Sequence, residues 1–146
     1  MAVEAGLAPV KGGRALIPGT ERMPADLLIP GWCGGRDAAL DVTVIHPLQV
    51  ATRAGAATTP GYALTFAYDR KVRGAGELCR REGIAFILVV AESLGGLHPT
   101  AVDQLRRLAR GVATKKGEEE STVTNHLSKV SLTLMKGLSS MVLNRN

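Results

Sequence analysis

Residues 84–90 form an uninterrupted apolar run, and this run restricts the possible folds more than any other feature of the chain. It is too short to span a membrane and rich in β-branched residues, which is typical of a strand covered on both faces of a sheet. Residues 62–82 precede it with apolar side chains at helical spacing, and Gly83 is suited to end that helix. Residues 39–45 come earlier and form a β-branched strand ended by a proline. The order strand, helix, buried strand predicts a parallel βαβ unit in an α/β domain.

Three further elements complete the expected domain. Residues 25–29 predict a short strand that ends at Pro30-Gly31, and the glycine-containing loop 31–37 suits a wide hairpin connection to the strand at 39–45. A helix is expected from Pro99-Thr100 to about residue 112, and a longer apolar helix over 123–141. We expect residues 1–20 to be a truncated or irregular N-terminal element and residues 115–146 to be a C-terminal helical extension.

The excess of positive charge is concentrated in one part of the chain. The formal net charge is +5, and residues 61–116 carry ten basic and five acidic residues, so the whole excess lies there. Such a distribution indicates either a face that contacts phosphate groups or the solvated surface of a helix. Aromatic residues make up 3% of the chain, which argues against a stacking platform for single-stranded bases.

The ends and the cysteines favour an intracellular protein, nuclear or cytoplasmic, with no membrane segment. No apolar run approaches the length of a transmembrane helix, and the N-terminal residues lack the order of a signal peptide. Cys33 and Cys79 are too few for a disulfide framework and wrongly spaced for a zinc knuckle.

Three charged residues lie where the pattern calls for apolar ones. Asp41 is in the middle of a predicted strand, Asp26 holds a similar place in the preceding strand, and Lys71 lies on the apolar stripe of the predicted helix. If the strands pair as a hairpin, the two carboxylates share one face and require a cation between them, as in a Mg²⁺ site. Lys71 would meet Asp41 across the sheet. Alternatively, Asp41 caps a loop or pairs with Arg36, and the Lys71 side chain extends to the solvent at the rim of the helix.

Several short strings, taken in order, resemble the C-terminal restriction-like endonuclease region of non-long-terminal-repeat retrotransposon polyproteins. The strings are Arg22-Met23-Pro24-Ala25-Asp26, Gly31-Trp32, Gly35-Arg36-Asp37-Ala38-Ala39, Asp41-Val42-Thr43-Val44, Pro47-Leu48-Gln49, Arg70-Lys71, Phe86-Ile87-Leu88-Val89-Val90 and Glu92-Ser93-Leu94-Gly95-Gly96. The resemblance covers about residues 20–112. It implies a PD-(D/E)XK nuclease domain over residues 21–114, with three layers, a mixed central sheet and flanking helices. Members of that family nick target DNA so that a reverse transcriptase can prime from the break.

The resemblance also implies roles for individual residues. Asp26 corresponds to the first metal-binding carboxylate and Asp41 to the second, with Mg²⁺ or Mn²⁺ as the cofactor. Thr43 stands two residues after the second acid, where many such nucleases have the lysine, and Lys71 on the following helix fits that role instead. Glu92 matches an acid at the end of a strand, either as a third ligand or as a helix-capping residue. The expected partners are DNA and the reverse transcriptase portion of a longer polyprotein.

These residues lead to three hypotheses, two of which assign the chain a function. In the first, the chain is a metal-dependent endonuclease domain that nicks DNA, with arginines of two helices contacting phosphates. These arginines are Arg70, Arg73, Arg80 and Arg81 on one helix and Arg106, Arg107 and Arg110 on the next. In the second, the chain is an inactive remnant that binds DNA or protein. In the third, it is a structural fragment with no function of its own.

Overall fold

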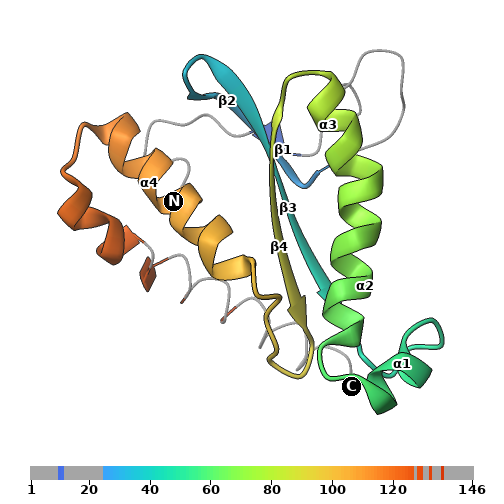
Figure 1. Ribbon diagram of the computed structural model, residues 1–146. Helices are drawn as coiled ribbons and strands as arrows, with labels where there is room; N and C mark the ends of the chain where they lie inside the picture. Colours follow the sequence, from blue (N-terminus) through green and yellow to red (C-terminus); the bar gives the residue numbers. More distant parts are fainter. Residues whose placement is uncertain (1–9, 12–24, 127, 130–131, 133–135, 137–146) are drawn as a thin grey trace.

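The computed structural model describes residues 10–11, 25–126, 128–129, 132 and 136. Its centre is a mixed sheet with the strand order β1-β2-β3-β4 (Figure 1). The strands are β1 (Val10–Lys11), β2 (Leu27–Cys33), β3 (Arg36–Ile45) and β4 (Ala85–Glu92). β2 pairs with β1 and β3 in the antiparallel sense, whereas β3 and β4 are parallel. The predicted α/β class and mixed sheet are therefore confirmed.

The β2–β3 connection is tighter than the predicted wide loop. Cys33 pairs with Arg36, and the turn between them consists of Gly34 and Gly35. Both glycines have positive φ, 59° and 77°, as a two-residue hairpin turn requires. The prediction that the strand ends before Pro30 is wrong, because β2 continues to Cys33 through a register shift after Ile29. A proline has no N–H to donate, so a strand tolerates it where the regular pairing is interrupted.

The predicted helix over residues 62–82 is present as one helical run with a widened middle. It comprises α2 (Tyr62–Lys71), the π-helical segment η1 (Val72–Gly76) and α3 (Glu77–Arg81). The π segment contains Gly74 and Gly76, which favour a regular α-helix less than other residues do. Val72, the first residue of this segment, is exposed. A short helix, α1 (Arg53–Thr58), precedes this run.

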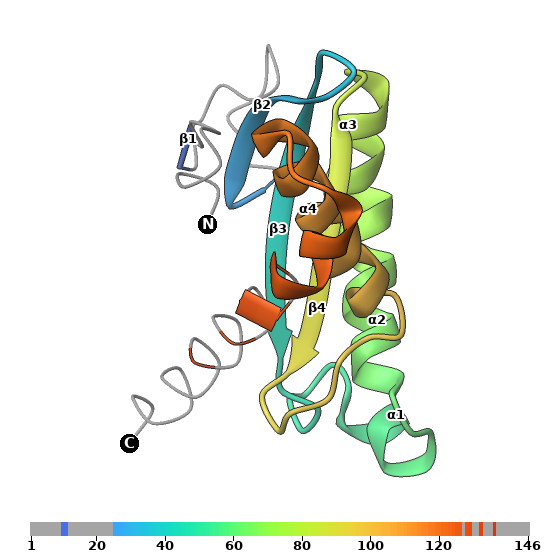
Figure 2. The ribbon, with the colours of Figure 1, turned by 90° about the vertical axis from the view of Figure 1, so that its left-hand side faces the viewer.

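Helices cover both faces of the sheet, which gives three layers (Figures 1 and 2). On one face, α4 (Ala101–Lys116) packs on alternate residues of β3 and β4, and α2 and α3 pack on the other residues of the same strands. The α4 side contains Ile29, Trp32, Ala38, Ile87, Val89, Leu105, Leu108 and Val112. The opposite side contains Ala25, Ala39, Ile45, Leu64, Ala67, Cys79, Leu88 and Val90. The double coverage explains why residues 84–90 are continuously apolar.

α4 is followed by a glycine and a short turn. α4 ends at Gly117, whose φ of 66° is the left-handed conformation favoured after a helix. A 3₁₀ turn, η2 (Glu120–Thr122), follows. The expected element at 1–20 and most of the helix expected over 123–141 lie outside the described residues. In the part of the chain that the structure describes, no helix has the length and apolar character to cross a membrane.

Candidate functional site

Asp41 is a carboxylate on the covered face of β3. It lies in register with Leu88 of β4, and its side chain is 5% exposed. Ala39 and Ile45 lie on the same face of the strand and belong to the apolar layer beneath α2 and α3. A carboxylate in such a place is stable only with a positively charged or hydrogen-bonding partner, because burial removes its hydration.

The partner of Asp41 is Lys71, the last residue of α2. The ammonium Nζ lies 2.9 Å from Oδ2 and 3.1 Å from Oδ1 of Asp41. The Lys71 side chain is 31% exposed, so the ammonium bridges the buried carboxylate and the solvent. The expected meeting of these two residues across the sheet is therefore present. The π segment begins directly after Lys71, so the helical run is widened beside the ion pair.

Thr43 and Cys79 both interact with the Asp41 carboxylate. The Thr43 hydroxyl donates a hydrogen bond of 2.7 Å to Oδ2 of Asp41. Burial, and secondarily the negative charge of Asp41, raise the pKa of the Cys79 thiol. Cys79 is fully buried and remains a protonated core residue. The contact of Thr43 was not predicted, although residues two apart on a strand share a face and the pairing could have been read from the sequence.

Asp26 immediately precedes Leu27, the first residue of β2. Its Oδ2 accepts a hydrogen bond of 2.9 Å from the backbone N–H of Val42, the residue after Asp41. The pairing of β2 with β3 ends at Leu27 and Leu40, so the carboxylate takes over a strand N–H beyond that end. This bond holds Asp26, which is exposed, beside the Asp41 backbone.

Asp26 and Asp41 each provide carboxylate oxygens at the neighbouring edges of β2 and β3. Carboxylate oxygens are the preferred ligands of these ions, and one or two carboxylates with waters and phosphate oxygens are the usual complement. Within the described residues, no group of three or more His, Cys, Asp or Glu side chains is placed to hold a metal. An ion at this site would therefore depend on two protein carboxylates, and the remaining ligands would come from water or substrate.

Glu92 lies away from the other two acids. It pairs in register with Ile45, four residues along β3 from Asp41, which corresponds to about 13 Å. Its backbone N–H donates a hydrogen bond of 2.7 Å to Gly96 O and closes the turn after β4. The structure therefore places Glu92 in this turn rather than beside Asp41, and α4 begins only at Ala101.

The seven arginines expected to contact phosphates belong to two different layers. Arg70, Arg73, Arg80 and Arg81 lie on the run α2–η1–α3, whereas Arg106, Arg107 and Arg110 lie on α4. All seven are exposed, but the sheet separates the two groups (Figure 2). The Asp41–Lys71 pair lies in the α2 layer, so only the first group shares its side of the sheet.

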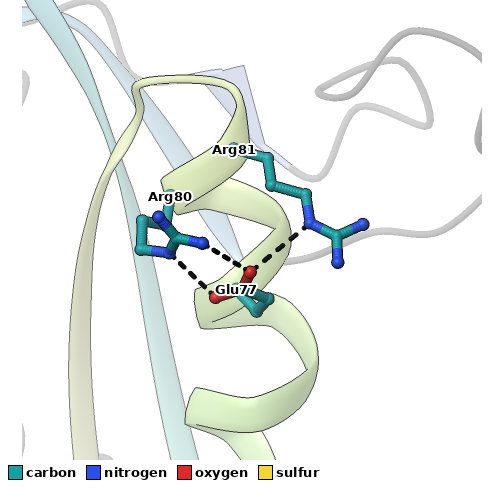
Figure 3. A network of polar contacts seen from close by, with 3 residues as sticks. All are labelled: Glu77, Arg80 and Arg81. Atoms are coloured by element: carbon teal, nitrogen blue, oxygen red, sulfur yellow. Dashed lines mark hydrogen bonds and ion pairs between the residues drawn. The ribbon is translucent and has the colours of Figure 1, made fainter.

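Two arginines of the first group are held by an acidic residue on the same helix (Figure 3). Both oxygens of the Glu77 carboxylate accept hydrogen bonds from Arg80, 2.7 and 2.9 Å long, and Oε1 also accepts a bond of 3.4 Å from Arg81. The bond from Arg80 is the main reason why the pKa of Glu77 falls to about 2. Glu77 therefore stays ionised at neutral pH and offsets part of the positive charge of α3.

Comparisons with known proteins give no relative to set beside this geometry. No protein-family model matches the chain, and neither a curated protein nor a solved structure matches it.

Proposed function

We propose that the chain is a metal-dependent endonuclease domain of the PD-(D/E)XK type, of retroelement origin, that nicks one strand of DNA. The observation that carries this proposal is the 2.9 Å contact between Lys71 on the helix connecting β3 and β4 and the buried carboxylate of Asp41 on β3. The resemblance of residues 20–112 to retrotransposon endonuclease regions supports it. The Asp26 carboxylate beside the Asp41 backbone supplies the second acid that the mechanism needs.

Each residue has a separate task in the proposed reaction. Asp26 and Asp41 would hold Mg²⁺ or Mn²⁺, and the ion would supply Lewis-acid polarisation of the scissile phosphate and activation of water. Lys71 forms an ion pair with Asp41 and presents its remaining N–H donor to the solvent side. A phosphate oxygen or the attacking water at that side would accept its hydrogen bond. The positive charge would stabilise the negative charge that develops on the phosphate group.

The arginines of the α2–η1–α3 run would hold the DNA backbone. Arg70 and Arg73 are the nearest of them to Lys71 in the chain and are exposed. Arg70 lies over the Phe66 ring at 5.9 Å, and Arg73 donates a hydrogen bond to Asp69 O. Their charges would provide sequence-independent affinity for phosphates, because contacts to the backbone position DNA without reading its bases.

Glu77→Gln is expected to strengthen DNA binding. The substitution removes the ionised carboxylate that holds Arg80 and Arg81, so both guanidinium groups become available to phosphates. We expect the affinity for duplex DNA to rise about threefold and the logarithmic salt dependence to steepen by up to about one unit per new phosphate contact. Fluorescence anisotropy over a range of NaCl concentrations measures both. Unchanged affinity would show that this part of α3 does not face DNA.

Calorimetric titration of Mn²⁺ tests the metal site directly. We expect wild-type protein to release or absorb heat with a stoichiometry of one, and Asp41→Asn to lose that heat because a neutral amide is a poor ligand for a hard divalent cation. Asp37→Asn is the matched control, since Asp37 is also on β3 but accepts a hydrogen bond from Gly31 N in the hairpin. Equal heats for all three proteins would contradict the proposed site.

A non-catalytic DNA-binding module is the second candidate. It is favoured by one observation: in the structure, both oxygens of Asp41 and one oxygen of Asp26 already accept hydrogen bonds from the protein itself. This module would bind DNA with a steep salt dependence and show no heat with Mn²⁺.

A further inference from the structure

A second positively charged surface lies on the opposite face of the sheet, where α4 and the β2–β3 hairpin enclose a cleft of about 740 Å³. The hairpin contributes residues 31–34, and α4 contributes Arg106, Arg107, Arg110 and Lys115. Arg106, Arg107 and Arg110 lie within about 100° of one another around α4, and Lys115 lies further round the helix, about 13 Å along its axis from Arg106. The cleft volume falls in the range of small-ligand sites, so it suits a short stretch of an extended molecule.

The cleft has a strong excess of positive charge. Of the described residues that line it, Asp103 is the only carboxylate, and it pairs with Arg106 at 3.3 Å. Among the residues that the structure describes, Arg107 and Lys115 form no ion pair, and both are exposed. The partner that fits such a lining carries several negative charges in a row.

Part of the cleft lining is an apolar contact between Trp32 and Gly111. The Trp32 ring lies against Gly111 of α4, and a side-chain carbon at Gly111 would overlap that ring. Trp32 is buried, so its ring face is occupied by the helix and does not serve as a stacking surface for bases. Recognition in this cleft would therefore rest on charge along a backbone rather than on base contacts.

We infer that this cleft binds the phosphodiester backbone of a single nucleic-acid strand without a divalent metal. Guanidinium groups present paired N–H donors that match phosphate oxygens, and three of the four cations are arginines. Sites for single strands commonly have a positively charged groove that follows the backbone, and this cleft has a positively charged lining. The sheet separates the cleft from Asp41 and Lys71, so this inference does not rest on the proposed nicking activity.

Binding of a labelled, mixed-sequence oligonucleotide of about twelve nucleotides tests the inference. Fluorescence anisotropy is measured in EDTA, so that a failure of the metal-dependent activity does not affect the result. Contacts from three to four cations predict a slope of log K against log[salt] of about −2 to −3.

Arg107→Glu is expected to weaken binding about tenfold. Arg53→Glu removes an exposed arginine from α1, outside the cleft, and is expected to change binding less than about twofold. Equal losses in both variants would overturn the inference.

Cys33 provides a second readout within the cleft. It lines the cleft and is an exposed thiol, whereas Cys79 is buried and serves as the internal control. The oligonucleotide is expected to slow alkylation of Cys33 by iodoacetamide at least about threefold in wild-type protein and to have little effect in Arg107→Glu. Unchanged alkylation under saturating oligonucleotide would place the strand elsewhere and overturn the inference.

Competition identifies the chemistry of the ligand. Polyglutamate carries carboxylates in place of phosphodiesters, and for a phosphodiester site it should displace the oligonucleotide only at a much higher concentration of charge. If polyglutamate displaces the oligonucleotide equally well and protects Cys33, the cleft is a site for an acidic polypeptide and the inference fails.

Discussion

Lys71→Met is expected to reduce Mg²⁺-dependent nicking of supercoiled plasmid at least about hundredfold, the scale found when one positioned electrostatic group is lost from an active site. Methionine keeps the length and apolar stem of the lysine but has no charge and no N–H donor. The Asp41 carboxylate would lose the ammonium now 2.9 Å away, and the phosphate would lose its proposed donor. Conversion of supercoiled to open-circular plasmid, followed over time in Mg²⁺ and in Mn²⁺, measures the rate.

Two companion variants make the nicking experiment specific. Lys71→Arg keeps the positive charge at the end of α2 and should retain part of the rate. Lys116→Met removes a lysine of similar exposure, 26% against 31%, from the α4 layer, where its carboxylate partner Glu118 is 33% exposed. Nicking by Lys116→Met should equal that of wild type. Wild-type rates in Lys71→Met would exclude the proposed mechanism, and equal loss in both methionine variants would point to a general effect of charge.

Lys71→Met is also expected to lower the free energy of unfolding by about 3 kcal/mol, because it leaves the buried Asp41 carboxylate without its cation. Asp41→Asn should cost less, about 1 kcal/mol, since the Lys71 ammonium is partly exposed and can extend into water. The double variant Lys71→Met/Asp41→Asn should be more stable than Lys71→Met alone. Urea unfolding followed by circular dichroism measures the free energy of unfolding of wild type, both single variants and the double variant, which together form a double-mutant cycle.

The proposed ion pair predicts which of the two single variants, Lys71→Met or Asp41→Asn, loses more stability. A coupling energy of about 2 kcal/mol, with the lysine variant the less stable single variant, follows from a pair in which only the acid is buried. Lys116→Met should change stability by less than about 0.5 kcal/mol, as expected for a partly exposed surface ion pair. If the Asp41 and Lys71 effects simply add, the ion pair contributes nothing to stability and Asp41 is held by Thr43 alone.

The sequence indicated the acid–lysine pair because each residue violates a local pattern. Asp41 interrupts a β-branched strand and Lys71 interrupts the apolar stripe of a helix, and a buried charge requires an opposite one. Glu92 carried no comparable signal, and its distance from Asp41 depends on the register between β3 and β4. The π segment after Lys71 was also not predicted, because periodicity assumes one regular turn along the whole helix.

By itself, the sequence determined the α/β class, the parallel order of β3 and β4 around one helix, and the meeting of Asp41 with Lys71. These features depend on hydrophobic periodicity and on the cost of burying a charge, both of which act over short stretches of chain. Only the tertiary structure decided how the arginines are distributed between the two faces of the sheet. α2 and α4 each carry arginines, and nothing local to either helix specifies which face of the sheet it covers. The apolar cluster that α4 forms with β2, β3 and β4, with Trp32 against Gly111, places α4 and the second positively charged cleft on the face opposite Lys71.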